Sequence, residues 1–187
     1  MGKLISLINV TPDGFCGSEL VIADAEFHEF VHGLLADTHT VGFGRNTFEM
    51  FQGIWPPMLE KEGHPASQVK MARALHDKNK TVFSSTLNST SWHNSTITQT
   101  INAEDIDRIK RGSDKNLLTI GSPGLVATLT KMNVVDEYYF SLQPVIAGHS
   151  GVRLFDKTGL DARLPLKPAG IKQLQSGVII IHYVKKD

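Results

Sequence analysis

Short apolar runs alternate along the chain with longer stretches in which apolar and polar residues follow helical spacing. This alternation is typical of a sheet built from strand–helix–strand units. The near-continuous apolar character of the runs indicates strands that are buried on both faces, as in a parallel sheet covered by helices. The runs predicted as strands are Leu4–Val10, Thr40–Phe43, Thr81–Phe83, Leu117–Ile120 and Tyr138–Leu142.

Three of the stretches between these runs have the pattern of helices, Ala103–Arg111 and Leu125–Met132 among them. The first has an apolar residue at positions i, i+3, i+4, i+7 and i+8, which lie on one face of a helix. That face consists of Phe27, Phe30, Val31, Leu34 and Leu35. The segment Trp55–Pro65 is predicted as a loop or a lid, because proline cannot sit inside a helix or donate to a strand ladder.

The pattern changes after Leu142, where glycines separate short segments. The most β-prone run of the chain, Val178–Val184, ends this region. We therefore expect antiparallel strands at one edge of a mostly parallel sheet. Since no shift in composition marks a boundary, residues 1–187 are predicted to form a single α/β domain.

Composition and charge exclude several classes of function. Nineteen basic residues balance nineteen acidic ones, and no block of like charges offers a surface for nucleic acid or an anionic membrane. No apolar stretch reaches the roughly 20 residues of a membrane-spanning helix, and Met1–Val10 lacks the long apolar region of a secretory signal. The single cysteine, Cys16, can form no internal disulfide. We expect a cytoplasmic protein that binds a small molecule.

The segment His28–His32 has the form H-E-x-x-H, which in metalloproteases places two zinc ligands one helical turn apart beside a general base. The longer form of this motif continues with a glycine and a third histidine, where this chain has Leu35 and Thr38. On the helical wheel Glu29 points away from the apolar face and the two histidines lie along its edge. This placement favours a solvated helix flank over a zinc hydrolase, and we expect no metal.

Three predicted strands end in residues that suit a phosphate group. The first is followed by Gly44–Glu49, a glycine turn and a helix start with Arg45 and Thr47. Helix starts present free N–H groups and a partial positive charge. The second ends in the hydroxyls of Ser84–Thr86, which could also form a turn.

The third of these strands leads into Gly121–Leu125. Here Ser122 is predicted to cap a helix that begins at Pro123, so a purely structural role would also explain this segment. Ligands of open α/β sheets bind beyond the carboxyl ends of the strands. Three such ends in one domain therefore indicate a nucleotide that carries phosphate.

Six short motifs follow one another in a fixed order over nearly the whole chain: Thr11-Pro12-Asp13-Gly14, Gly44–Glu49, Val82–Leu87, Gly121–Leu125, Val135–Tyr138 and Pro144–Gly148. As an ordered set they resemble the dihydrofolate-reductase-like superfamily. Within it they are most similar to the reductase domain at the C-terminus of the bifunctional riboflavin-biosynthesis deaminase/reductase and to its stand-alone bacterial relatives. The deaminase half is absent, because one cysteine cannot build its zinc site.

The resemblance implies an NADPH-dependent reductase. By this resemblance Arg45 and the pair Ser84 and Ser85 hold the 2′-phosphate, Thr47 and Gly121–Ser122 hold the pyrophosphate, and the end of the first strand lies near the nicotinamide. The cofactor residues implied in this way are Val10, Thr11, Gly14, Gly44, Arg45, Asn46, Thr47, Ser84, Ser85, Thr86, Gly121, Ser122, Pro123, Gly124 and Leu125.

The resemblance also implies a substrate site. The reaction of the riboflavin branch reduces a ribosylamino-pyrimidine, and the expected substrate is this or another small heterocycle. Asp13 and His28 are the candidates for proton handling, and Glu26 and Trp55 are the candidates for substrate contacts. His28 stands where a dihydrofolate reductase carries the carboxylate that holds the pterin.

Two alternative functions stay open beside this one. Asp24, Glu26 and Glu29 lie close enough to His28 for a small shift to restore a carboxylate, which would permit dihydrofolate or pterin reduction. A nucleotide-binding protein without catalysis is the second alternative. A phosphorylated substrate would need basic side chains, for which Arg153 and Lys157 are candidates. Relatives of this family and the β-rich C-terminus suggest a homodimer.

Overall fold

The computed structural model describes residues 1–149, 151–156, 158–160 and 162–186. Its main sheet has eight strands in the order β5-β4-β3-β6-β1-β7-β10-β9. All pairs from β5 to β7 are parallel, and β10 and β9 are antiparallel additions at one edge. This arrangement confirms the predicted mostly parallel sheet with antiparallel C-terminal strands. The strands are β1 (Leu4–Val10), β3 (Thr38–Gly44), β4 (Asn79–Phe83), β5 (Ser95–Thr98), β6 (Asn116–Ile120), β7 (Glu137–Leu142), β9 (Leu166–Gln173) and β10 (Ile179–Lys185).

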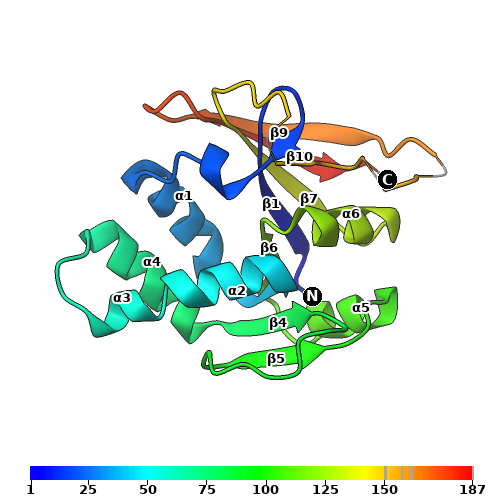
Figure 1. Ribbon diagram of the computed structural model, residues 1–187. Helices are drawn as coiled ribbons and strands as arrows, with labels where there is room; N and C mark the ends of the chain where they lie inside the picture. Colours follow the sequence, from blue (N-terminus) through cyan, green and yellow to red (C-terminus); the bar gives the residue numbers. More distant parts are fainter. Residues whose placement is uncertain (150, 157, 161, 187) are drawn as a thin grey trace.

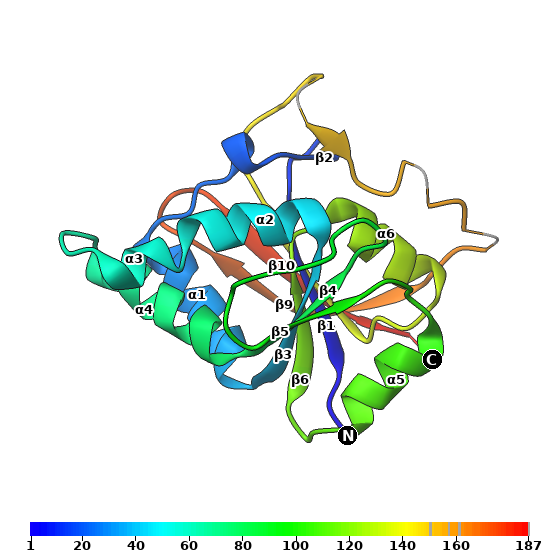
Figure 2. The same ribbon diagram turned by 60° about the horizontal axis from the view of Figure 1, so that its bottom comes forward.

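Helices cover both faces of the sheet, α1 and α4 on one side and α5 and α6 on the other (Figures 1 and 2). β9 and β10 form the edge farthest from β5 (Figure 1). In the described residues no helix is long and apolar enough to span a membrane. The helices are the short 3-10 turn η1 (Ser18–Leu20) and α1 (Ala25–Ala36), α2 (Arg45–Ile54), α3 (Pro57–Glu60), α4 (Ala66–Asp77), α5 (Ala103–Arg111) and α6 (Pro123–Lys131).

β1 shows why its sequence is mostly apolar. Successive side chains of a strand point to opposite faces of the sheet. Ile5 and Leu7 belong to the core on the side of α1 and α4, whereas Leu4, Ile8 and Val10 pack on the side of α5 and α6. The central strands therefore have a core on each face, as their pattern predicts.

The segment predicted as a loop, Trp55–Pro65, contains a short helix, so that prediction was wrong over Pro57–Glu60. Pro57 stands at the first helical position, where its missing N–H costs no hydrogen bond. The next helix, α4, was not predicted. Its buried positions are few, and one of them is the small residue Ala72.

β4 begins two residues earlier than predicted, because the pattern treats a lysine as a surface residue. Lys80 is only 1% exposed. Its Nζ donates to the carbonyl oxygens of Leu75, His76 and Lys78 at 3.0, 3.0 and 2.7 Å, at the end of α4. A second, two-stranded sheet was also missed, since its strands β2 (Phe15–Cys16) and β8 (Val152–Arg153) are too short to produce a period.

Candidate functional site

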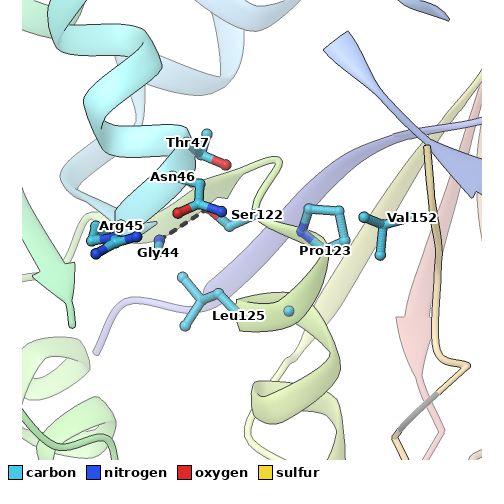
Figure 3. A pocket seen from close by; sticks show the side chains of 9 residues that line it. Gly44, Arg45, Asn46, Thr47, Ser122, Pro123, Leu125 and Val152 are labelled. Atoms are coloured by element: carbon cyan, nitrogen blue, oxygen red, sulfur yellow. Dashed lines mark hydrogen bonds between the residues drawn. The ribbon is translucent and has the colours of Figure 1, made fainter. Parts of the chain in front are cut away.

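A cavity of about 310 Å³ lies at the carboxyl ends of β3 and β6, where the chain turns into α2 and α6 (Figure 3). Eight of its nine lining residues come from two of the glycine-containing turns singled out in the sequence. The ninth, Val152, belongs to β8 and lies on the opposite wall. The sequence around Val152 contains no motif that predicts this position. The lining residues are Gly44, Arg45, Asn46, Thr47, Ser122, Pro123, Gly124, Leu125 and Val152.

Two helix starts meet at this cavity, and within the described residues neither has a side-chain cap. The expected cap at Ser122 is wrong: the residue occupies the N-cap position, but its hydroxyl makes no capping bond. Ser122 has a left-handed backbone, with φ at 58°, and its Oγ instead accepts a 2.9 Å hydrogen bond from the N–H of Gly44 (Figure 3). This bond ties the two turns together and leaves the first-turn N–H groups of both helices without a side-chain acceptor.

Gly44 packs against the second turn at ordinary contact distance. A Cβ built at Gly44 would lie 3.4 Å from both Cβ and Oγ of Ser122. The backbone of Gly44 is extended, with φ at −82°, a conformation that other residues also adopt. Neither the space nor the backbone at this position therefore requires a glycine.

Arg45 reaches from the start of α2 toward the end of β4. Its Nη1 donates to Oγ1 of Thr86 at 3.0 Å, and its Nε lies 3.8 Å from the carboxylate of Glu49. Ser84 holds the turn after β4, because its Oγ accepts from the N–H of Thr86 and Leu87 at 3.2 and 2.9 Å. Ser85 is exposed. The structure therefore brings a cation and three hydroxyl residues together beside the cavity, although the three are not on its wall.

Val10, Thr11 and Gly14, implied to lie near the nicotinamide, do not line this cavity. Val10 and Thr11 are buried at the end of β1 and in the turn that follows it, and Gly14 has a positive φ of 87°. The Thr11 hydroxyl donates to Oδ1 of Asp13 at 2.7 Å. Together with the N–H groups of the segment 147–148, this bond lowers the pKa of Asp13 to about 2.

His28 is buried in α1, with 6% of its surface exposed, so the expected solvated flank is wrong at this residue. Trp55, at the end of α2, covers it with its ring edge-on and the ring centroids 5.8 Å apart. The helical wheel of one helix contains no information on such a neighbour. Burial lowers the pKa of His28 below its ordinary value, although the Asp24 carboxylate partly offsets this effect.

Two buried polar atoms near this contact have no hydrogen-bond partner among the described residues. They are Nδ1 of His28 and Nε1 of Trp55. Buried polar groups are nearly always paired, so each of these atoms requires an explanation.

The acidic residues near His28 are all engaged elsewhere. Asp24 caps α1, with Oδ1 accepting from the N–H of Phe27 at 2.8 Å. Glu26 accepts from the N–H of Gln175 at 2.8 Å, in the turn between β9 and β10. Glu29 is exposed and pairs with Lys70 on α4 at 2.8 Å. No carboxylate of these three takes the place of His28.

Neither the histidine motif nor Arg153 lines the cavity. Glu29 points toward α4, and the described part of the chain holds no group of three or more His, Cys, Asp or Glu side chains that could bind a metal. The guanidinium of Arg153 lies 5.1 Å above the ring of Phe15. Lys157 lies outside the described residues.

Several known proteins are similar to this chain. An uncharacterized protein of Bacillus subtilis (strain 168), YyaP, is 26% identical over 188 residues, which cover 97% of this chain and 94% of that protein. RibD of Acinetobacter baumannii is 13% identical with a TM-score of 0.70, and the match covers 100% of this chain and 58% of that one. A dihydrofolate reductase from Enterococcus faecalis, complexed with NADP(H), is 13% identical with a TM-score of 0.63, and the match covers 100% and 98% of the two chains.

At these identities the two solved structures establish a shared fold, and they confirm the dihydrofolate-reductase-like architecture. The model of the RibD C-terminal domain family matches residues 11–180, which is most of the chain and includes both turns of the cavity. The chain therefore belongs to the RibD C-terminal domain family.

Proposed function

We propose that this protein is an NADPH-dependent reductase that transfers hydride to a ribosylamino-pyrimidine or a similar small heterocycle. The observation that carries the proposal is the meeting of two helix starts without side-chain caps, those of α2 and α6, at one cavity. Free N–H groups and the positive ends of two helix dipoles favour a strongly anionic group between them. The pyrophosphate of a dinucleotide is such a group.

The residues present fit this cofactor along the length of the site. Thr47, Ser122 and the backbone of Gly124 would hold the pyrophosphate at the cavity. Arg45, with the hydroxyl residues 84–86 beside it, would hold the 2′-phosphate that distinguishes NADPH from NADH. When bound, the nicotinamide supplies the hydride. The chain's part is to fix its orientation and to exclude water, for which Val10, Thr11 and Gly14 are the proposed contacts.

His28 and Trp55 are the proposed substrate contacts. A neutral imidazole can donate or accept a hydrogen bond, and the indole N–H can donate one. Both have a buried nitrogen that has no partner in the described part of the chain, and a substrate carbonyl or ring nitrogen could satisfy it after a small movement of the side chains. We further propose that His28, in its protonated form, donates the proton that accompanies the hydride, whereas Glu26 supports the site through its bond to Gln175.

This chemistry favours the riboflavin-type substrate over dihydrofolate. A protonated pterin ring needs a carboxylate to balance its charge, and a neutral histidine cannot supply one. Asp24, Glu26 and Glu29 already have other partners. A nucleotide-binding protein without catalysis differs from the proposal in a single respect, because it would bind NADPH without consuming it.

The proposal extends to assembly and location. Phe140, Ile181 and Ile171 are successive cross-strand partners on β7, β10 and β9, and Ile171 is 76% exposed. A second copy that covers this row would form a homodimer. Pairing of free strand edges is disfavoured, because Lys167 and Pro168 lie on the edge strand. The buried single cysteine fits a cytoplasmic protein, as proposed from composition.

Thermal melting with NADPH and with NADH tests the cofactor. A ligand at 100 times its Kd stabilises the native state by about 2.7 kcal/mol. We expect NADPH to raise the Tm more than NADH, and Arg45→Ala to lose at least tenfold in NADPH affinity with little change for NADH. Arg73→Ala, which removes an exposed arginine on α4, is the matched control. Equal effects of both nucleotides on the wild type would contradict the assigned 2′-phosphate site.

Oxidation of NADPH in the presence of 5-amino-6-(5-phosphoribosylamino)uracil, followed at 340 nm, tests the reaction. Turnover with this compound and none with dihydrofolate is the expected result. Binding of NADPH without turnover on either compound would favour the non-catalytic alternative.

A further inference from the structure

The Asp13 carboxylate joins two segments that are far apart in the sequence. Its Oδ1 accepts from Oγ1 of Thr11 at 2.7 Å and from the N–H of Ala147 at 3.1 Å, and its Oδ2 accepts from the N–H of Gly148 at 2.8 Å. In the described residues no cationic group lies within ion-pair distance of Asp13. Its charge is therefore stabilised by neutral donors alone, which aim at both oxygens.

These contacts lie where two neighbouring strands end. β1 and β7 run parallel and side by side, so the turn 11–14 and the segment 144–149 leave the sheet at the same edge. The ladder itself ends with the N–H of Gln143 donating to the carbonyl of Val10 at 2.9 Å. Beyond that point the Asp13 side chain supplies the bonds that hold residues 147 and 148 against the turn.

Shortly after Ala147 and Gly148 in the sequence, the strand β8 reaches the wall of the cavity. Residues 151–154 lie along the strand that follows the turn: β8 pairs with β2, and the N–H of Leu154 donates to the carbonyl of Gly14 at 2.9 Å. Gly151 is so close to this strand that a Cβ would come within 2.5 Å of the carbonyl oxygen of Cys16. This small sheet lies above α2 and α6 (Figure 2), and its residue Val152 forms one wall of the cavity (Figure 3).

We propose that Asp13 is a positioning residue: its carboxylate clasps residues 147–148 to the turn after β1 and thereby places β8, with Val152, against the cofactor cavity. The proposal rests on the proposed cofactor function of that cavity. It replaces the role in proton transfer expected for Asp13. A carboxylate with a pKa of about 2 is ionised throughout the physiological range, and its oxygens are occupied by donors.

Two substitutions distinguish a positioning role of Asp13 from a role as proton donor. In Asp13→Asn the amide oxygen can take the place of Oδ1, but the amide nitrogen then faces the N–H of Gly148, and two donors cannot bond. Asp13→Ala removes all three bonds. The clasp therefore predicts graded effects, with Asn intermediate and Ala more severe. A proton donor predicts that both variants lose turnover equally.

Residue-specific amide hydrogen exchange tests the clasp without any ligand. In Asp13→Asn we expect exchange at Gly148 to accelerate at least tenfold while Ala147 stays protected, and in Asp13→Ala we expect both to accelerate. Asp107→Asn, at a half-exposed aspartate on α5 that pairs with Arg111, is the control and should leave both amides unchanged. Unchanged exchange at Gly148 in Asp13→Asn would overturn the clasp. The amide spectra report at the same time whether each variant is folded.

Steady-state oxidation of NADPH then tests the consequence at the cavity. We expect the KM for NADPH to rise at least fivefold in Asp13→Asn and further in Asp13→Ala, with a smaller change in kcat and an unchanged pH profile. Loss of one limb of the pH profile in both variants, with an unchanged KM, would assign proton transfer to Asp13 and overturn the proposal. If the wild type fails to bind NADPH, the proposed function fails, whereas the exchange result still decides whether the clasp exists.

Discussion

Lys80 shows how a single residue can contradict its sequence pattern. It lies in β4 with 1% of its surface exposed, and its ammonium group donates to three carbonyl oxygens at the end of α4. Trp92 lies 4.8 Å from the same nitrogen. Burial lowers the pKa of Lys80 to about 8, from an ordinary value of 10.5. The ammonium group thus satisfies carbonyl oxygens at the end of α4 that have no donor within the helix.

This pKa predicts that the protein becomes more stable as the pH rises above 8. Between pH 8 and about 10 the unfolded chain keeps the proton on Lys80 and the folded chain releases it, so the free energy of unfolding rises with pH. The rise cannot exceed about 1.4 kcal/mol per pH unit. Urea unfolding of the wild type and of Lys80→Met over this range measures it as the difference between the two proteins.

Only the difference is informative, since other groups titrate in the same range. Burial raises the pKa of the Cys16 thiol to about 11, which lowers stability above pH 9 equally in both proteins. Lys61→Met, a change at an exposed lysine, should follow the wild type. Parallel curves for the wild type and Lys80→Met would show that Lys80 does not titrate as stated.

At His28 the side chain proposed to serve catalysis lowers the stability of the fold. Its unpaired buried Nδ1 costs free energy, which an apolar side chain of similar size would not. We expect His28→Leu to unfold with a free energy about 1 kcal/mol higher than the wild type and to lose NADPH-dependent turnover at least tenfold. His32→Leu, one helical turn further along, is the control and should keep its activity. Full activity in His28→Leu would exclude the proposed role of His28.

At the scale of elements, the starts of α2 and α6 carry the proposed cofactor site through their backbone. Asn46, in the first turn of α2, lines the cavity. A carboxylate at this place stabilises a helix by about 0.3–1 kcal/mol but repels a bound anion. We therefore expect Asn46→Asp to keep or raise the Tm while it weakens NADPH binding at least fivefold, as measured by a fluorescence titration.

The helix α5 offers the matched change. Asn102 caps this helix, with Oδ1 accepting from the N–H of Asp105 at 2.8 Å, and it is remote from the cavity residues. Asn102→Asp adds the same charge to another helix start and should leave NADPH binding unchanged. Equal binding by Asn46→Asp and the wild type would show that the α2 start does not contact the phosphates.

At the scale of the whole molecule, the antiparallel strands β10 and β9 form the edge of the sheet that is farthest from β5 (Figure 1). Ile171 stands on the outermost strand, 76% exposed, next to Ile181 on β10. If a second copy covers this row, Ile171→Lys should convert a dimer into a folded monomer, as measured by light scattering after size exclusion. Ile146→Lys, at a loop residue that is 69% exposed, should remain dimeric. A monomeric wild type would remove this part of the proposal.

The sequence by itself determined the features that depend on neighbouring residues. The apolar runs predicted β1, β3, β6 and β7, because each central strand needs apolar residues on both faces. The glycine turns after β3 and β6 predicted the cavity, because backbone geometry and helix polarity are local properties. Eight of the nine cavity residues belong to these two turns.

Only the tertiary structure decided which of these ends meet and what closes them. Ser122 and Gly44 are 78 positions apart. The Ser122 hydroxyl, predicted to cap its own helix, instead bonds to Gly44 and joins the turns that follow β3 and β6. Val152 reaches the cavity, and Trp55 buries His28, through packing of segments that are distant in the sequence. Periodicity records which face of an element is apolar, but it holds no information on which element will cover that face.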